Sequence, residues 1–340
     1  CDNNEEEQLA DYGCMLWGNV TYGYQNSGKG FPANSSLTNG IYTNRTWSQP
    51  HLISYMESHD EQRLMYESIT FGNASNPAHN AKDPYTALGR MQGLAVTFLS
   101  QPGPRMIWQF GEYGYDINID YPCRVCNKPI LWNYLQQGRR QQLLDVYTAM
   151  LTLRNNYETF RSLDFQASLG AGIKRMIMNH PTMNGVSLVN IDVNASSAIP
   201  AFQHTGMWYE YFTGDSLNVT NVNASIPLQP GEYRVYTDVP LPKPYITSVA
   251  SIEDLENPSF DFSVFPVPFE SDLTIKLISQ DFQSLEVQVF DAQGILLKSQ
   301  RTMAMVGANE VHLNSLILPS GTYLILVKLG NSIAHKTIVK

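Results

Sequence analysis

The hydrophobic and polar positions of the chain follow two patterns, and the change from one to the other comes near Leu163. Before Leu163, short apolar runs end in polar turns and longer segments carry apolar residues at helical spacing, which predicts alternating strands and helices. The predicted strands cover residues 14–19, 51–58 and 105–110, and the predicted helices cover 5–12, 87–100 and 139–160. After Leu163, apolar and polar residues alternate in short segments bounded by turn residues, which predicts antiparallel strands. These strands cover residues 173–178, 186–191, 208–212 and 232–236.

The same patterns divide the chain into four parts, and its 340 residues leave room for several domains with their own cores. The predicted fold class is α/β followed by all-β. We expect an α/β part at 1–162, a β-domain at 163–239, a linker at 240–259 and a second, sandwich-like β-domain at 260–340. The linker begins with the stiff sequence Pro240-Leu-Pro-Lys-Pro244.

A segment rich in glycine, asparagine and serine, residues 22–45, follows the first predicted strand. Its composition predicts a long loop. Long loops inside compact domains are usually functional, and this one would lie on the face that carries the site. A plain surface excursion would have the same composition, so both interpretations stay open.

Composition narrows the classes of function. The formal net charge is −9 and the isoelectric point is near 5.2, so the chain lacks the positive excess that a nucleic-acid partner requires. No uninterrupted apolar run is long enough to cross a bilayer, and we expect no transmembrane segment. No signal peptide opens the chain either. Because the chain begins with Cys1 and not with methionine, we expect that an amino-terminal part is missing.

The four cysteines are too few for a disulfide scaffold at this length. Cys123 and Cys126 are the only close pair, in a loop between Tyr-Pro and Asn-Lys-Pro. Cys1 and Cys14 do not supply the second pair that a zinc site needs. The pair therefore predicts a loop disulfide or two inert thiols, with metal binding as the less favoured alternative.

Two polar residues, His59 and Asp60, stand at the end of the second predicted strand. The carboxyl ends of barrel strands are where barrel enzymes place their chemistry, which makes this pair a candidate site. A structural interpretation competes with it. Ser58 and Glu61 have the spacing of a capping box, and Asp60 would suit the positive end of a helix that begins there.

A second motif favours the functional interpretation. The sequence Gly103-Pro-Arg-Met-Ile-Trp-Gln-Phe-Gly-Glu112 follows one predicted helix later. Together with Tyr55-Met-Glu-Ser-His-Asp60, it resembles the eighth- and seventh-strand motifs of the α-amylase family, glycoside hydrolase family 13. The second motif is offset, because Pro104 directly follows the first glycine and Glu112 directly follows the last one.

This resemblance implies a fold and a site. Residues 1–162 would be the carboxy-terminal portion of a (β/α)8 TIM barrel, strands 6 to 8, and residues 163–239 the small β-domain C that follows such barrels. Asp60 would stabilise the transition state, and His59 would bind the same sugar ring of an α-glucan substrate. The calcium that is possible by resemblance would be held by ligands outside this chain.

The chemistry implied by the resemblance also needs groups that the chain does not contain. Retaining glycosidases use a carboxylate nucleophile and a carboxylic acid that also serves as base. In the family these lie at the ends of the fourth and fifth strands, which would precede Cys1. Glu57 and Glu112 occupy motif positions that the family does not use for bond cleavage, so neither is assigned these roles.

The end of the chain carries a second resemblance. Phe265-Pro-Val-Pro268, Val287-Gln-Val-Phe-Asp-Ala-Gln-Gly294 and Leu318-Pro-Ser-Gly-Thr-Tyr323 together resemble the carboxy-terminal sorting domain of the type IX secretion system, although the first motif usually reads Tyr-Pro-Asn-Pro. Residues 260–340 would then engage the secretion machinery, and the protein would be secreted or attached to the surface of a bacterium of the Bacteroidetes type.

The sequence therefore predicts the carboxy-terminal part of a secreted α-glucan hydrolase that is inactive as the chain stands. A 1,4-α-glucan branching or transglycosylating enzyme is the alternative from the same superfamily. A non-catalytic surface starch-binding protein is the alternative from another class.

Overall fold

The computed structural model describes residues 3–248, 261–291, 295–314, 316–330 and 332–340. The chain divides into two compact units, residues 1–248 and 249–340. Among the described residues, no helix combines the length and the apolar character that a membrane span requires.

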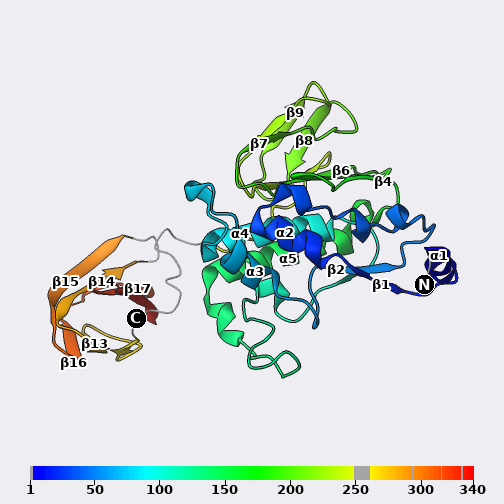
Figure 1. Ribbon diagram of the computed structural model, residues 1–340. Coiled ribbons are helices and arrows are strands. Elements are labelled where there is room, and N and C mark those ends of the chain that lie inside the picture. Colours follow the sequence, from blue (N-terminus) through cyan, green and yellow to red (C-terminus); the bar gives the residue numbers. More distant parts are fainter. Residues whose placement is uncertain (1–2, 249–260, 292–294, 315, 331) are drawn as a thin grey trace. The chain divides into compact units, whose positions relative to one another are not determined.

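The first unit begins with the predicted alternation of strands and helices (Figure 1). A three-stranded parallel sheet has the order β1-β2-β3, from Leu16–Asn19, Leu52–Tyr55 and Arg105–Met106. The helices of this part are α1 (Asn3–Asp11), α2 (Thr21–Lys29), α3 (Leu64–Phe71), α4 (Pro84–Leu99) and α5 (Gly138–Asn156). The predictions of α1, α4, α5 and the first two strands are confirmed within a few residues.

The segment 22–45 is not a long loop, and that prediction was wrong. It contains most of α2, followed by three short 3-10 turns: Pro32–Asn34, Thr38–Gly40 and Tyr42–Arg45. The small residues that suggested a loop allow close packing of this helix instead. A Cβ atom on Gly23 would lie 2.2 Å from the carbonyl oxygen of Ser36, and one on Gly28 would lie 2.9 Å from a hydroxyl of α3.

The third strand is shorter than predicted, with two residues in place of six. Phe110 has a φ of 59°, in the left-handed region, so the extended backbone cannot continue to it. Its ring packs in an aromatic cluster with Tyr115 at a centroid distance of 5.8 Å and with Trp132 at 5.0 Å.

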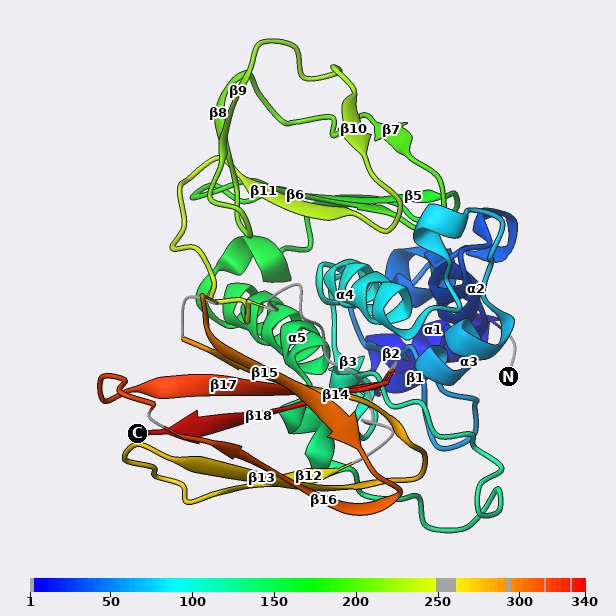
Figure 2. The same cartoon turned by 90° about the vertical axis from the view of Figure 1, so that its left-hand side faces the viewer.

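A β-domain completes the first unit. Its main sheet has the order β4-β5-β6-β11-β8-β9, and a separate pair joins β10 to β7. The bounds are Phe165–Ser168 (β4), Ile173–Met178 (β5), Gly185–Asn190 (β6), Ser196–Ala198 (β7), Gly206–Glu210 (β8), Ser216–Val219 (β9), Ile226–Leu228 (β10) and Tyr233–Thr237 (β11). This confirms the predicted change to antiparallel strands. Figure 2 shows β5, β6 and β11 lying across α4 and α5, and one apolar core joins these helices to the sheet.

Buried basic side chains tie the β-domain to the α/β part. Arg90 of α4 is 3% exposed, and it donates to the carbonyl oxygens of Gly28 and Ser27 at 2.7 Å each and of Ile191 at 2.5 Å. The ammonium group of Lys174 on β5 donates to Ser35 Oγ at 2.9 Å and to the carbonyl oxygen of Leu169 at 3.0 Å. These bonds add donors to buried carbonyl oxygens at the end of α2 and at strand ends, and so link the two parts of the first unit.

Residues 240–248, from the predicted linker, remain with the first unit. Leu241 and Ile246 pack against its main core. The amide nitrogen of Thr247 donates to the carboxylate of Asp145 at 2.7 Å, and Gln142 donates to the carbonyl oxygen of Thr247 at 2.8 Å. Residues 249–259, the rest of the predicted linker, lie outside the described residues.

The second unit has two antiparallel sheets, with orders β12-β13-β16 and β15-β14-β17-β18. The bounds are Phe262–Phe265 (β12), Leu273–Ser279 (β13), Gln283–Phe290 (β14), Leu296–Ala304 (β15), Gly307–Leu313 (β16), Thr322–Leu329 (β17) and Ser332–Val339 (β18). Alternate residues of β13, β14 and β17 point into one apolar core, as in a β-sandwich. Among them, Val287 and Ile325 are completely buried.

Candidate active site

His59 and Asp60 lie in the turn that follows β2, at the carboxyl end of the parallel sheet. Their side chains are 71% and 76% exposed, and His59 Nε2 lies 3.4 Å from the carboxylate of Asp60. The ring of Trp108, which follows β3, lies 5.6 Å from the His59 ring. The two sequence motifs therefore meet at one edge of the sheet. The roles assigned to His59 and Asp60 stay predictions.

The turn between β2 and α3 is not a capping box. Ser58 and Glu61 do form a hydrogen bond, but α3 begins only at Leu64. At the start of α3, the carboxylate of Glu57 accepts a hydrogen bond from the amide nitrogen of Leu64 at 3.1 Å. Glu61 also accepts a hydrogen bond from the side-chain amide of Asn19 at 2.5 Å, and this bond links the end of β1 to the turn after β2.

Glu57 is 6% exposed, and burial raises the pKa of its carboxyl group. Gly111 packs directly against it, because a Cβ there would lie 2.6 Å from Glu57 Oε1. The glycine of the second motif thus makes room for the glutamate of the first. Burial also raises the pKa of Glu112 in the same region. The contacts of Glu57 give it a structural role at the start of α3.

Arg63 lies beneath this edge and was not singled out by sequence reasoning. It is 3% exposed, and burial lowers its pKa. Its guanidinium group lies 5.0 Å from the Tyr115 ring and 6.0 Å from the Trp108 ring. Its Nη1 atom has no hydrogen-bond partner among the described residues. A buried guanidinium donor without a partner is costly.

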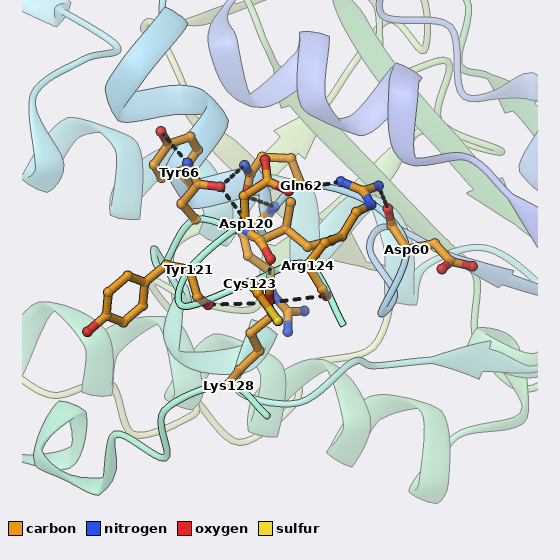
Figure 3. Close-up of polar contacts among 11 residues, drawn as sticks. Asp60, Gln62, Tyr66, Asp120, Tyr121, Cys123, Arg124 and Lys128 are labelled. Carbon is orange, nitrogen blue, oxygen red and sulfur yellow. Dashed lines mark hydrogen bonds and ion pairs between the residues drawn. The ribbon is translucent and has the colours of Figure 1, made fainter. Parts of the chain in front are cut away.

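The loop after β3 that carries Cys123, Arg124 and Lys128 lies beside Asp60, and a disulfide and several hydrogen bonds hold it in place (Figure 3). Cys123 and Cys126 form a disulfide, which confirms the first of the two predicted states and excludes metal binding by this pair. The Lys128 ammonium group donates to the carbonyl oxygens of Cys123 at 2.7 Å, Tyr121 at 3.2 Å and Arg124 at 3.3 Å. This lysine acts as a central cation around which the backbone is wrapped.

Three further hydrogen bonds attach the loop to the turn after β2 and to α3. Arg124 Nη2 donates to the carbonyl oxygen of Asp60 at 2.5 Å. Asn118 accepts from Gln62 at 3.0 Å and donates to the hydroxyl of Tyr66 at 2.9 Å (Figure 3). The loop thus forms a fixed wall beside the exposed carboxylate. No signal in the sequence identified the contacts of Arg124 and Asn118, because they join residues more than 50 positions apart.

Among the described residues of the first unit, the parallel sheet is well covered on one face only. Leu52 and Ser54 point into the covered face and are 2% and 1% exposed. On the other face, Trp17 lies opposite Ile53 in the register, and Asn19 lies opposite Tyr55. Trp17 is 62% exposed. Among the described residues, β1 and β3 each pair with a strand on one side only.

The acidic, histidine and cysteine side chains that the structure describes are the candidate ligands for a metal ion. Among the described residues, no three of the histidine, cysteine, aspartate and glutamate side chains gather where they could hold a metal ion. The calcium implied by the family resemblance therefore stays a prediction about ligands outside this chain.

Comparison with known families identifies the end of the chain. Residues 263–340 match the family described as the secretion system C-terminal sorting domain. This tail is a type IX sorting domain. The protein is therefore exported to the cell surface or secreted. No curated protein sequence matches the chain.

Comparison with solved structures returns α-amylases. The α-amylase from Geobacillus thermoleovorans is 15% identical with a TM-score of 0.47, and the match covers 69% of this chain and 51% of that one. The α-amylase from H. orenii is 15% identical with a TM-score of 0.48, covering 70% and 51%. A maltogenic α-amylase from Thermotoga neapolitana is 13% identical with a TM-score of 0.48, covering 68% and 53%. The chain spans about half the length of these structures.

Proposed function

We propose that this chain is the carboxy-terminal part of a secreted α-glucan hydrolase of the α-amylase type, in which Asp60 and His59 hold the sugar ring whose bond is broken. The observation that carries the proposal is the meeting of two motifs at one edge. The His59–Asp60 turn after β2 and Trp108 after β3 lie together, with ring centroids 5.6 Å apart. Parallel strands place catalytic side chains at this edge in barrel enzymes.

Asp60 suits the role of a transition-state stabiliser. Its carboxylate is 76% exposed and has one near partner, His59 Nε2 at 3.4 Å, so sugar hydroxyls have access to it. Hydrogen bonds to the sugar 2-OH strengthen as the ring becomes oxocarbenium-like, so a fixed carboxylate there lowers the barrier more than it tightens substrate binding. The wall formed by Arg124 and the Lys128 loop fixes the backbone of Asp60 before substrate arrives.

The nucleophile and the acid/base are proposed to lie on strands that precede β1. Glu57 is not available for either role, because its carboxylate is buried and anchors the start of α3. The uncovered sheet face supports this part of the proposal. Parallel sheets are normally covered on both faces, and further strands of a barrel would cover Trp17 and Tyr55.

Product analysis of the intact protein tests the proposal and separates its alternatives. Incubation with soluble starch should release reducing sugar from a retaining hydrolase. A branching or transglycosylating enzyme would change chain lengths and branch points with little net gain of reducing ends. A starch-binding protein would retain the polymer and change neither, and that outcome would overturn the proposal. The upstream sequence offers a second check, because the proposal requires an aspartate and a glutamate at the ends of the fourth and fifth strands.

A further inference from the structure

A large cleft in the first unit lies between α4 and the strands of the β-domain. Its volume is about 900 Å³, which falls in the upper part of the range of small-molecule sites, roughly 300–1,000 Å³. Among the described residues, it shares no lining residue with the candidate active site. Nothing in the proposed catalytic function uses it.

The helical wall of the cleft is one face of α4. Tyr85, Gly89 and Gln92 line it, and their spacing of four and three residues places them on the same side of the helix. A Cβ atom on Gly89 would meet no atom within 4 Å. The glycine therefore leaves open space in the middle of this wall, where a larger side chain would fill the cleft.

The opposite wall is aromatic and polar. Phe212 and Tyr233 pack edge to face, with ring centroids 5.1 Å apart. The hydroxyl of Tyr233 donates to the side-chain oxygen of Gln92 at 3.0 Å and so joins the two walls. Rings on both sides of a cleft offer flat apolar surfaces, and their hydroxyls offer polar edges.

Basic and acidic side chains both line the cleft: Arg139 and Arg234, and Glu210, Asp215 and Glu232. Arg234 and Glu232 form an ion pair at 2.7 Å. The carboxylate of Glu210 accepts from the amide nitrogens of Thr213 at 2.6 Å and Val235 at 2.9 Å. The guanidinium group of Arg139 lies 5.3 Å from the Tyr85 ring. With two basic and three acidic side chains in its lining, the cleft lacks the positive excess that would select a phosphate.

We infer that this cleft is a second binding site, which takes a neutral oligosaccharide. Sugar rings present apolar C–H faces that suit the Tyr85, Phe212 and Tyr233 rings, and hydroxyls that both donate and accept. The guanidinium, amide and carboxylate groups of Arg139, Gln92 and Glu232 supply the matching acceptors and donors. That the oligosaccharide is an α-glucan rests on the proposed function. The cleft would hold the polymer while the site at Asp60 acts on another part of it.

The open space at Gly89 gives a matched pair of variants for the test. Gly89→Ala adds one methyl group and leaves the cleft open, whereas Gly89→Leu fills it. Both residues are better helix formers than glycine, so neither variant should lower the melting temperature. The intact protein is run on native gels that contain soluble starch, and its retardation is compared with gels that contain no polysaccharide. Titration with maltoheptaose in solution gives the affinity.

We expect Gly89→Leu to weaken retardation about tenfold or more, while Gly89→Ala behaves like the wild type. Phe212→Ala is the independent variant should Gly89→Leu fail to fold, and Phe71→Ala, an exposed aromatic residue at the end of α3, is its control. Equal retardation of the wild type, Gly89→Leu and Phe212→Ala would overturn the inference. Asp60→Asn separates the two proposals. If it abolishes turnover while Gly89→Leu leaves retardation intact, the cleft proposal fails alone; if it leaves turnover intact while Gly89→Leu removes retardation, the catalytic proposal fails alone.

Discussion

The two units of this chain differ in the charged side chains that they bury and in how completely their sheets are covered. In the second unit, the buried residues among those described are apolar except for Ser279, and both sheets contribute to one core. The first unit buries several charged side chains, among them Glu57, Arg63, Arg90 and Lys174, and leaves one sheet face open around Trp17. The comparison indicates that the second unit closes its own apolar core, whereas the first unit uses buried charged groups to join its two parts.

The largest effect is expected from a core deletion in the second unit. Ile325→Ala removes a completely buried side chain from a closed core, and we expect a loss of about 2–5 kcal/mol in the free energy of unfolding. Urea unfolding followed by circular dichroism measures it. A cost below about 1 kcal/mol would mean that this core is loosely packed and would remove the contrast between the units.

A pH-dependent effect above pH 7 is expected in the first unit, at Lys174. Burial lowers the pKa of Lys174 to about 7. In the unfolded chain this ammonium group keeps its ordinary pKa near 10.4, so between pH 7 and 10 the unfolded state binds more protons and the Lys174 contribution to stability rises with pH. Comparing wild type with Lys174→Met at pH 7 and pH 9, we expect the wild type to gain about 1–2 kcal/mol over the variant. A gap that stays constant across this range would contradict the buried, weakly basic lysine.

Because one sheet face is open, removing a large side chain from it should lower the free energy of unfolding only slightly, whereas the same change in a core would lower it strongly. Trp17→Ala removes a large ring that is 62% exposed, and we expect it to cost the 340-residue chain less than about 1 kcal/mol. In the intact protein, where further strands would cover this face, the same substitution should cost several times more. Equal costs in the two proteins would argue against additional strands on this face.

The last effect, at the loop beside Asp60, is expected to be local. Cys123→Ser opens a disulfide that spans three positions, and short closed loops give limited stabilisation, at most about 2 kcal/mol. Because Lys128 still holds the loop carbonyls, global stability should change little while proteolytic cleavage within residues 116–137 becomes faster. Lys128→Met is the companion variant, and it should loosen the loop more than the cysteine change does.

Much of the fold could be predicted because periodicity reports burial directly. The strand at Ile173–Met178 was predicted with its observed bounds from its apolar residues, although its burial does not alternate and Lys174 is buried. The helix α2 was missed because Gly23 and Gly28 serve close packing, which composition alone cannot separate from a loop. The third strand was predicted too long because nothing in its apolar pattern indicates the left-handed backbone at Phe110.

Of the candidate active site, only the residues within the two sequence motifs could be predicted. His59, Asp60 and the second glycine motif were visible in sequence, because short-range spacing carries them. The buried Arg63, the helix-start role of Glu57 and the contact of Arg124 with Asp60 were not, since they depend on which loops meet in space. The cleft at Gly89 was invisible for the same reason.

The most direct test of the central claim is the turnover of an α-glucan by the intact protein with Asp60→Asn, measured beside Asp120→Asn. Asp120 is a matched control, because it is an exposed aspartate of the neighbouring loop that contacts Arg124. We predict that Asp60→Asn lowers kcat on maltoheptaose by at least about 100-fold with little change in KM, since the lost interaction strengthens in the transition state. Asp120→Asn should stay within a few-fold of the wild type. Near-normal kcat in the Asp60 variant would contradict the assignment of this edge as the active site.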